Sequence, residues 1–490
     1  MTAAGSPAAD APRPVLRSGD LSWSGDELRH EAVALGDRLA HLGTRVLATL
    51  LDNSPAWVVA DHAAALARLV HVPLALFFSP TQTAHCLRLA GADTLLVPAA
   101  AAGRWPGLAG PRCTIAGASF ALLRLDAAPA SIPAGTAKIT FTSGTTGAPR
   151  GVCLSSAALH AVRDGLVQAL GPLHVQRHLC ALPLSVLLEN VAGLMAPMAA
   201  GATCVVPPLA QLGLGGSSSF DPDRFQQAVL EHQPNSVILL PQMLRAWAGW
   251  LARTGRRAPA SLSFVAVGGA AVGRRLIDTA RSLGIPAYEG YGLSEAGSVQ
   301  TLNLPGADRP GSAGRSLPHA RVRIAVDGEI EVGGSLFSGY LGDGHASERD
   351  WWRTGDLGSI DADGFVHVTG RRKNVLITGF GRNVAPEWVE ASLRGEAAIA
   401  EAVVFGDAEP SLSAVLWPAS ADLDDARLDL AVDAANETLP DYARVRRWTR
   451  ARGAFDAGSG FATNNGRPQR TAIWQAHRDA LVHSPHGADA

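Results

Sequence analysis

Neither sign of charge predominates in this sequence, and the lack of excess positive charge argues against a polyanionic partner. The 490 residues include 42 Lys and Arg against 44 Asp and Glu, which gives a formal net charge of −2. Proteins that hold nucleic acid or an anionic lipid surface by electrostatics need clustered basic charge. We therefore expect no nucleic-acid partner.

Cysteine is also scarce. The sequence has only 5, with no C-x-x-C pair and no short metal-like spacing among them: Cys86, Cys113, Cys153, Cys180 and Cys204. This pattern is typical of reduced thiols in a cytoplasmic protein. Histidine adds no metal motif, because His174 and His178 have helical i, i+4 spacing but no H-E-x-x-H pattern and no nearby cysteine ligand. We expect these two histidines to be a solvated or capped pair.

An uninterrupted apolar run of membrane-spanning length is missing as well. Residues 1–20 are broken up by charged side chains and lack the apolar block of a signal peptide. The uncharged stretch 190–220 contains three prolines, which divide it into a short helix, a turn and a strand at 203–206. We expect a cytoplasmic protein without an integral membrane segment.

Short apolar segments alternate with helical ones in the N-terminal half. Strand-like segments at 46–51, 72–76 and 94–97 are separated by helical segments at 54–69 and 81–90. The alternation returns with further strand-like segments at 236–240, 264–267 and 287–291. This pattern is typical of parallel strands joined by helices, and it predicts an α/β fold.

The pattern changes in the C-terminal third of the chain. After Gly314, short strands with tight turns at 322–326 and 329–332 predict an antiparallel or barrel-like subregion. The basic stretch 370–374 leaves a final segment of about 120 residues, near the commonest domain size. We predict a large N-terminal domain over 1–370, with α/β layers and a small β-barrel-like subregion, and a small α+β domain over 371–490.

The strongest chemical signal is a loop rich in Thr, Ser and Gly that follows an apolar strand. Glycines let successive N–H groups turn toward one anion, while hydroxyls and a nearby arginine add donors and positive charge. It is not a Walker loop, because it has no G-K-[ST] ending. The ordered string favours a polyphosphate site over a flexible surface turn. Its predicted nucleotide-binding residues are Thr142, Ser143, Gly144, Thr145, Thr146, Gly147 and Arg150.

Residues 142–151 resemble the signature loop of the adenylate-forming superfamily, which contains acyl-CoA synthetases, adenylation domains and luciferases. One such block arises easily by chance, but an ordered series does not. Further matching blocks follow in the family's order along most of the chain: 268–270, 288–295, 328–330, 352–356, 370–373, 379–390 and 465–467.

The block 288–295 carries the expected metal ligand. Glu295 follows a glycine-rich turn after a strand, and its carboxylate is a hard oxygen ligand of the kind that Mg²⁺ prefers. The resemblance assigns it that role. Tyr291, beside Gly292, has a ring suited to stacking on adenine. Ser294 keeps a hydroxyl where the family usually has Thr, and Gly269 and Ala270 are expected to line the nucleotide site.

Two later blocks supply a ribose site and a hinge. Asp356 can accept hydrogen bonds from the two ribose hydroxyls, and Arg371 can pair with phosphate or ribose. The resemblance places Lys373 where the small, mobile domain swings between two half-reactions. It also places Gly379 and Gly381 in a tunnel for the attacking thiol.

The sequence departs from the family pattern at two positions. Val186 stands where many relatives carry His or an aromatic residue, at a gate of the predicted acyl pocket. Arg467 replaces the family's catalytic lysine near the C-terminus, and the planar guanidinium is not equivalent to an ammonium group. The other residues of the predicted acyl pocket are Leu187, Val267 and Gly268.

The resemblance implies an ATP-dependent, AMP-forming acid–thiol ligase. A carboxylate would attack the α-phosphorus of ATP, pyrophosphate would leave, and a thiol would take the acyl group from the acyl-adenylate. The implied cofactors are ATP, Mg²⁺ and coenzyme A. Phrases such as 182–185 and 369–374 resemble the fatty and long-chain acyl-CoA synthetase branch, which favours an apolar fatty acid, with an aryl acid second.

Alternatives stay open at this stage. The phosphopantetheine thiol of an acyl carrier protein presents the same reacting group as coenzyme A, so a stand-alone enzyme that loads a carrier protein fits equally well. The changes at Val186 and Arg467 also fit a degenerate, non-catalytic nucleotide-binding protein. The run Gly292 to Ala296 is one residue away from the G-x-S-x-G elbow of hydrolases, but that function leaves the polyphosphate loop unexplained.

Overall fold

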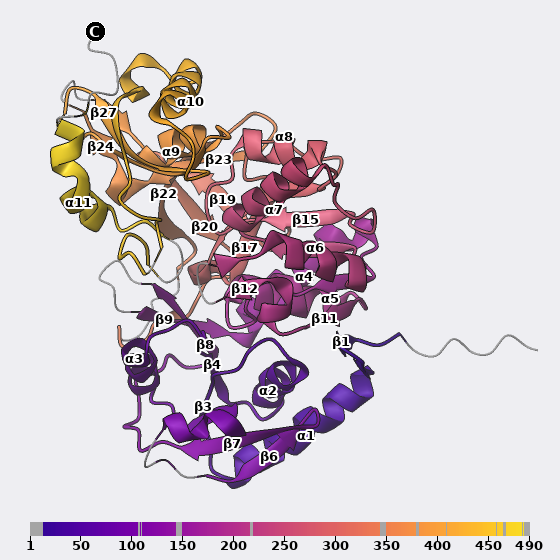
Figure 1. Cartoon of the computed structure of the whole chain (residues 1–490). Helices are drawn as coiled ribbons and strands as arrows, with labels where there is room; N and C mark the ends of the chain where they lie inside the picture. Colours follow the sequence, from indigo (N-terminus) through magenta and orange to yellow (C-terminus); the bar gives the residue numbers. More distant parts are fainter. Residues whose placement is uncertain are drawn as a thin grey trace, which may run out of the picture.

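The computed structural model describes residues 13–105, 108, 110–143, 149–215, 219–343, 349–378, 382–407, 409–456, 458–463, 467–482 and 484. In Figure 1 a sheet of indigo and purple strands lies at the bottom, a second sheet with magenta strands lies above it, and orange and yellow elements lie at the top. None of the helices in this described part combines the length and the apolar composition that crossing a bilayer requires.

The first sheet lies at the bottom of the molecule. Its strands are β3 (Val46–Thr49), β4 (Val70–Pro73), β5 (Thr94–Pro98), β6 (Arg112–Ile115), β7 (Ala118–Arg124), β8 (Thr136–Ser143), β9 (Pro149–Ser155) and β21 (Gly339–Tyr340). Within the described residues they form one sheet in the order β21-β9-β8-β4-β3-β5-β7-β6. The central strands are parallel, whereas β6, β7, β9 and β21 pair in antiparallel fashion.

Helices cover both faces of the first sheet. α1 (Gly25–His41) and α2 (Pro55–Leu66) pack on the face that carries Leu47 of β3. α3 (Pro80–Ala90) packs on the opposite face, which carries Ala48. Successive residues of a strand point to opposite faces of the sheet. Because both faces of this sheet carry apolar side chains, helices bury both of them.

The second sheet is built around parallel strands. Its members are β1 (Leu16–Ser18), β2 (Leu21–Trp23), β10 (Arg177–Leu179), β11 (Thr203–Val205), β14 (Ser236–Leu239), β15 (Phe264–Val267), β16 (Ala287–Leu293), β17 (Ser298–Leu302) and β18 (Arg315–Ser316). Their order over the described residues is β18-β17-β16-β15-β14-β10-β11-β1-β2. The strands from β16 to β1 pair in parallel, so their carboxyl ends meet at one edge, where α/β folds place ligands.

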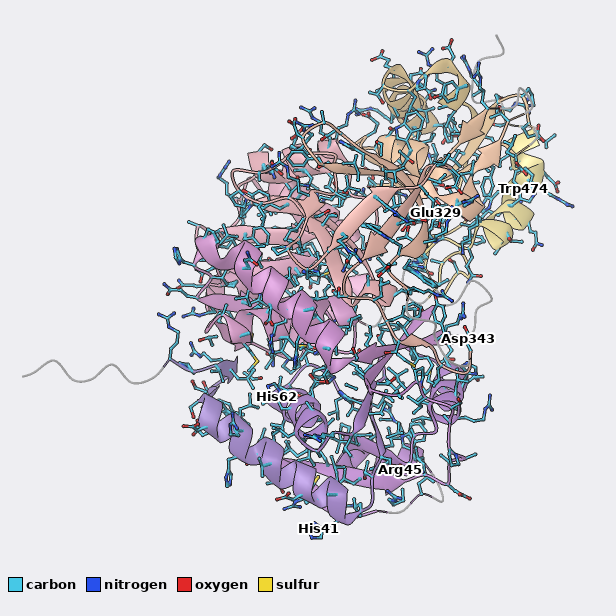
Figure 2. The ribbon with its side chains drawn as sticks, turned by 180° about the vertical axis from the view of Figure 1, so that it is seen from behind. His41, Arg45, His62, Glu329, Asp343 and Trp474 are labelled. Atoms are coloured by element: carbon cyan, nitrogen blue, oxygen red, sulfur yellow. The ribbon has the colours of Figure 1, made fainter. Side chains whose placement is uncertain are left out.

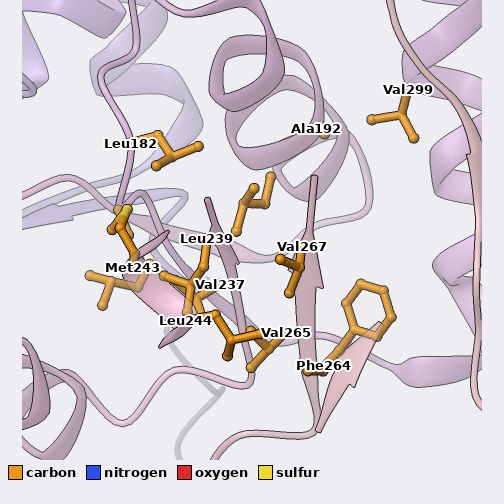
Figure 3. Packing of buried hydrophobic residues seen from close by; sticks show 14 of the residues in the cluster. Leu182, Ala192, Val237, Leu239, Met243, Leu244, Phe264, Val265, Val267 and Val299 are labelled. Carbon is orange, nitrogen blue, oxygen red and sulfur yellow. The ribbon is translucent and has the colours of Figure 1, made fainter. Parts of the chain in front are cut away.

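The largest hydrophobic core of the molecule lies on this second sheet. Val237 and Leu239 of β14 lie beside Val265 and Val267 of β15, as Figure 3 shows. These side chains are almost fully buried. The helices of this region are α4 (Ser156–Leu170), α5 (Ala196–Ala199), α6 (Pro222–His232), α7 (Pro241–Thr254) and α8 (Arg274–Ser282).

The C-terminal third contains two smaller sheets. One is antiparallel and consists of β19 (Arg321–Ile324), β20 (Glu329–Gly333), β22 (Trp352–Ile360) and β23 (Val366–Arg371). The other consists of β26 (Ile399–Phe405), β27 (Leu412–Pro418) and β28 (Val445–Arg450) and packs with α9 (Pro386–Arg394), α10 (Asp425–Glu437) and α11 (Arg470–Val482) around cores of its own. Two short pairs complete the strands: β12 (Leu214–Gly215) with β13 (Ser219–Phe220), and β24 (Leu376–Ile377) with β25 (Asn383–Val384).

The predicted fold class is confirmed. Parallel α/β layers, an antiparallel subregion and a C-terminal α+β part all occur where the sequence patterns place them. The strand predicted at 72–76 lies earlier in the chain, at Val70–Pro73. The uncharged stretch begins with a π-helical segment, Glu189–Met195, before α5 and β11. The predicted boundary at 370/371 falls at the last residues of β23, and the division into two domains stays a prediction.

Candidate active site

The ends of two paired strands hold the described part of the predicted polyphosphate loop. Thr142 of β8 lies opposite Arg150 of β9, and Ser143 lies opposite Pro149. The antiparallel pairing therefore holds both flanks of the loop together at one edge of the first sheet. Residues Gly144 to Gly147 lie outside the described residues, so their predicted contacts with phosphate stay predictions.

Glu295 lies directly beyond the end of β16. The strand has an irregularity between Tyr291 and Gly292, where a Cβ on Gly292 would lie only 2.1 Å from the backbone oxygen of Ser298. Glycine is therefore required for this close approach to β17. The chain then enters a short 3-10 turn that starts at Ser294 and carries Glu295. This turn sets the direction of the predicted metal ligand.

Tyr340 of β21 holds the Glu295 carboxylate. Its hydroxyl donates a hydrogen bond to Glu295 Oε1 over 2.8 Å. Burial and the Glu295 charge raise the pKa of Tyr340 well above its usual range, so the hydroxyl keeps its proton and remains a donor. The backbone is tied as well, because the Phe337 N–H donates to the Glu295 carbonyl over 2.8 Å. The sequence analysis did not predict this role for Tyr340.

Arg150 connects the loop to the same tyrosine. Its guanidinium carbon lies 3.7 Å from the centre of the Tyr340 ring, a cation–π contact. The guanidinium also pairs with Asp343 over 2.9 Å, and both side chains are more than half exposed. Figure 2 shows Asp343 at the margin of the first sheet. Arg150 and Glu295 thus share Tyr340 as a common neighbour.

The predicted ribose site contains a buried carboxylate. Asp356 of β22 faces Arg371 of β23 across the antiparallel pair, and Arg371 Nε lies 2.7 Å from Asp356 Oδ1. The Tyr291 hydroxyl donates to the other carboxylate oxygen over 2.7 Å. Burial raises the pKa of Asp356, and Arg371 and the Tyr291 hydroxyl oppose this change. Three predicted nucleotide-binding residues therefore form one hydrogen-bonded group.

The C-terminal segment carries the predicted second cation, Arg467. The Arg467 N–H donates to Thr463 Oγ1 over 3.2 Å, which closes the turn that carries the side chain. Arg467 is exposed. Partial burial of the guanidinium, and then the charge of Arg371, lower the pKa of Arg467, whereas Asp356 and Glu295 raise it. Its predicted role at the nucleotide site stays a prediction.

Lys373 lies at the edge of the same charged group. It occupies a short 3-10 turn, Arg372–Asn374, directly after β23. Burial lowers the pKa of Lys373, with smaller contributions from Arg371 and Arg467, and Asp356 and Glu387 oppose this change. The predicted hinge therefore adjoins the ribose group. Gly379 and Gly381, predicted for the thiol tunnel, lie outside the described residues.

The predicted acyl-pocket residues separate into two groups. Leu187 and Val267 belong to one buried hydrophobic cluster, whereas Val186 is only half-buried. Gly268 follows β15, and a Cβ there would lie 3.2 Å from the Gly290 carbonyl oxygen. This close approach brings the 268–270 block beside the 288–295 block. Gly269 and Ala270 are exposed, and Gly269 has a φ of +88°, which favours glycine.

Glu289 is a second site feature that the sequence analysis missed. Burial raises its pKa to about 8, and the Val272 N–H, which donates to its Oε1 over 3.2 Å, only partly offsets this. Its other carboxylate oxygen has no hydrogen-bond partner among the described residues. A buried acid with one unsatisfied oxygen is more stable in the protonated form.

Glu289→Gln should therefore stabilise the protein at alkaline pH. The folded-state pKa of about 8 exceeds the ordinary value of 4.5, so wild-type stability is complete below pH 4.5 and falls as the pH rises through 8. An amide does not ionise, and we expect a gain on the order of a few kcal/mol in the free energy of unfolding at pH 8 that disappears near pH 4.5. Urea unfolding at both pH values measures it. Parallel pH profiles of variant and wild type would contradict the assignment, and the exposed Glu231→Gln is the matched control.

The geometry assembles the chemistry of a charged, phosphorylated ligand. Arg150 and Arg371 carry positive charge, Glu295 is an oxygen ligand by chemical type, and Asp356 is predicted to accept hydrogen bonds from sugar hydroxyls. Arg150 lies on the first sheet, Glu295 follows a strand of the second, and Asp356 and Arg371 lie on the small antiparallel sheet. The arrangement can neutralise charge that develops on a phosphate group.

Two family models match the chain. Residues 4–341 match the family model "AMP-binding enzyme", and residues 373–481 match "AMP-binding enzyme C-terminal domain". The long-chain-fatty-acid–CoA ligase FadD15 of Mycobacterium tuberculosis is 42% identical over 154 residues, which cover 30% of this chain and 26% of that protein. The 2-succinylbenzoate–CoA ligase of Bacillus velezensis is 31% identical over 291 residues, which cover 56% of each chain.

A solved structure resembles nearly the whole chain. The o-succinylbenzoate CoA synthetase of Bacillus subtilis, in complex with an acyl-adenylate intermediate, has a TM-score of 0.75 at 22% identity and covers 98% of this chain and 96% of its own. This likeness shows the fold. The curated relatives are matched over about half of their length or less. Because the family models together match most of the sequence, the chain belongs to the AMP-binding enzyme family, the adenylate-forming superfamily that its sequence blocks resemble.

Proposed function

We propose that this protein activates a carboxylic acid with ATP to form an acyl-adenylate and then transfers the acyl group to a thiol, most simply that of coenzyme A. The observation that carries the proposal is the hydrogen-bonded group that Asp356 forms with Arg371 and Tyr291, in the same block of sequence as Glu295. Arg467, from the C-terminal segment, is proposed to add a positive charge to this group. Such a site is suited to charge development at a phosphate.

Each group has a role in the proposed adenylation step. Arg467 neutralises charge on the substrate carboxylate or the α-phosphate, and Asp356 with Arg371 holds the ribose. The Glu295 carboxylate fits Mg²⁺, because it is a hard oxygen ligand whose Oε1 is held in place by the Tyr340 hydroxyl. A bound Mg²⁺ would offset the negative charge of the polyphosphate. The similar B. subtilis enzyme has been solved in complex with ATP and a magnesium ion.

The substrate that we propose is an apolar acid. Leu187 and Val267, which are predicted for the acyl pocket, belong to a buried hydrophobic cluster, and an apolar wall favours a fatty acyl chain over a charged one. The partial match to the mycobacterial ligase, named for long-chain fatty acids, supports this choice. The longer match to a 2-succinylbenzoate ligase supports an aryl acid as the second choice. An acyl carrier protein remains the alternative thiol donor.

A second candidate of another class is a nucleotide-binding protein without catalysis. Arg467 is the feature that favours it, because a guanidinium stands where the family has an ammonium group. Yet a guanidinium keeps the positive charge of an ammonium group, and the sequence retains Glu295, Asp356 and Arg371. We therefore prefer the enzyme.

A panel of acids tests the proposal. Linear fatty acids of increasing length and several aryl acids are incubated with ATP and Mg²⁺, with and without coenzyme A, and pyrophosphate and thioester are measured. We expect acid-dependent pyrophosphate release and a thioester only when the thiol is present. ATP binding without pyrophosphate release for any acid would support the non-catalytic alternative instead.

Tyr340→Phe should weaken the metal site without removing its ligand. Loss of the hydroxyl frees the Glu295 carboxylate, and loss of a group that orients a ligand typically costs about tenfold in metal affinity. We expect the Mg²⁺ concentration for half-maximal pyrophosphate release to rise by about tenfold. Tyr288→Phe is the matched control, because that ring stacks on Phe264 with centroids 5.2 Å apart. An unchanged Mg²⁺ titration for Tyr340→Phe would contradict the assignment.

Lys373→Pro should separate the two half-reactions. Proline fixes φ and resists the backbone rotation that the proposed hinge requires, so acyl-adenylate formation should persist and thioester formation should be lost. Trapping the adenylate and measuring the thioester by mass spectrometry distinguishes the two steps. Lys373→Ala, which keeps backbone freedom, is the control. Equal loss of both steps in the proline variant would argue against the hinge.

A further inference from the structure

A buried cluster of possible metal ligands lies in the second sheet, away from the charged site. The sequence analysis expected His178 to be solvated or capped, and this was wrong. His178 belongs to β10 and is only 2% exposed, whereas His174 ends a 3-10 turn outside the strand. β10 pairs with β11 on one side and β14 on the other, and its residues His178 and Leu179 are buried. Cys180, two residues beyond His178, is a cysteine near this histidine.

Three different ligand types meet at this point. One potential ligand atom from each of His178, Cys180 and Glu189 lies within 4.8 Å of the other two, and all three residues are buried. His178 Nε2 lies 3.3 Å from Glu189 Oε1. Imidazole nitrogen, thiolate sulfur and carboxylate oxygen are the three ligand types that zinc accepts in proteins.

A fixed partner orients the imidazole. His178 Nδ1 lies 2.8 Å from Ser236 Oγ of the neighbouring strand β14. When Nδ1 carries the proton and donates it to this hydroxyl, Nε2 keeps its lone pair and directs it at Glu189. Metal-binding histidines are typically held in this way by a hydrogen bond to the other ring nitrogen.

A second sulfur lies beside the first. The thiols of Cys180 and Cys204 both contact the Gly193 carbonyl oxygen, at 3.5 and 3.7 Å. Cys204 is on β11, which pairs with β10. Cys204 is the register partner of His178, so its side chain lies on the same face of the sheet as the cluster and is the candidate fourth ligand.

The backbone around the cluster is unusual. Glu189 and Gly193 belong to the π-helical segment Glu189–Met195, a rare conformation that occurs often at functional sites. A Cβ on Gly193 would lie 2.3 Å from Glu189 Oε1 and 2.9 Å from His178 Nε2, so only glycine fits against the two ligands. This segment brings Glu189 to the strands.

The cluster also contains an unsatisfied group. Glu189 is fully buried, and its Oε2 has no hydrogen-bond partner among the described residues. A buried polar oxygen is costly when it has no compensating partner. A cation bound at this cluster would supply one.

We propose that His178, Cys180 and Glu189, with Cys204 as the fourth ligand, bind a divalent transition metal of the zinc class. Two thiolates, one imidazole and one carboxylate make a four-coordinate ligand set. Such a set binds zinc in preference to Mg²⁺ or Ca²⁺, which take oxygen ligands. The site is closed to solvent, so its role is structural. It fastens β10, β11 and the π-helical segment to one another, close to Leu187 of the predicted acyl pocket.

Metal analysis tests this proposal without any activity assay. The full chain, produced with zinc in the medium and purified without chelator or affinity tag, should contain about one zinc per chain by mass spectrometry of the metal. Replacement by Co²⁺ should give the intense sulfur-to-metal charge-transfer absorption of thiolate coordination. Mercurial modification of the thiols should release the zinc, detected with a chromophoric chelator.

Variants locate the metal. Cys180→Ser and Glu189→Gln should each lose most of the bound zinc, whereas Cys153→Ser, which removes a buried cysteine of β9 outside the cluster, should retain it. If the wild-type protein carries no zinc as purified and takes up neither Zn²⁺ nor Co²⁺ on refolding, the proposal is overturned and the cluster is held by a proton on Glu189. Zinc that persists in both cluster variants would also overturn it, because the metal would then lie elsewhere. Neither result depends on the proposed enzymatic function.

Discussion

Arg467→Ala is expected to slow ATP-dependent pyrophosphate release by a factor on the order of a hundred, the usual effect of removing one preorganised charge from a developing oxyanion. The carboxylates of Asp356 and Glu295 raise the pKa of Arg467, and the proposed role brings its guanidinium to the α-phosphate or the substrate carboxylate. Single-turnover pyrophosphate release with saturating ATP and acid measures the effect on the chemical step.

Two further measurements separate this role from general damage. Thioester formation from supplied acyl-adenylate should be nearly unaffected, because the segment that carries Arg467 is expected to leave the site before the second step. Arg446→Ala, which removes an arginine of β28 in the C-terminal sheet, is the matched control. Equal losses in both half-reactions would indicate misfolding or a different role.

Arg467→Lys addresses the non-catalytic alternative directly. It restores the residue that the resembling family carries, and it should retain or raise activity if the pocket accepts an ammonium group. If the wild type releases no pyrophosphate with any acid, but the lysine variant does, the natural protein is a nucleotide-binding protein with a disabled site. The two variants together therefore decide between the candidate functions.

Glu295→Gln is expected to abolish most Mg²⁺-dependent pyrophosphate release, by a factor of roughly a hundred or more. An amide is a neutral and weaker ligand than a carboxylate, but it has the same shape. Its carbonyl oxygen can still accept the hydrogen bond from the Tyr340 hydroxyl, so the fold should be preserved. A titration of pyrophosphate release against Mg²⁺ measures the loss.

Thermal unfolding without metal provides the check on folding for this variant. The melting temperature of Glu295→Gln should match that of the wild type, and Glu231→Gln, an exposed change on α6, should alter neither property. Full activity in Glu295→Gln at limiting Mg²⁺ would rule out Glu295 as the metal ligand.

The sequence predicts those parts of the site that are contiguous. The run Tyr291 to Glu295 reads as a strand followed by a glycine-rich turn, and the structure has both. Asp356 and Arg371 were each predicted from their own blocks. Their direct contact follows from the register of β22 and β23, which a pattern of apolar residues does not specify.

Other parts depend on contacts between distant segments. Tyr340 occupies a two-residue strand with no periodicity, and its place beside Glu295 arises only because β21 pairs with β9. His178 was misjudged because i, i+4 spacing has meaning only on a helix, and the residue lies on a strand. The position of Glu189 beside His178 cannot be predicted from the sequence, because a π-helical segment leaves no recognisable sequence signal.

Strands that are distant in the sequence pair with each other, so some of them wait for their partners while the chain is being synthesised. Leu16 of β1 pairs with Cys204, and β21 pairs with β9 nearly 190 residues before it. At about 5–20 residues per second, a ribosome takes roughly 10–40 seconds to make the chain between two such partners. During that interval β9 and β1 are unpaired edges, open to pairing with other nascent chains. The yield of folded protein should therefore rise when chaperones are supplied during synthesis.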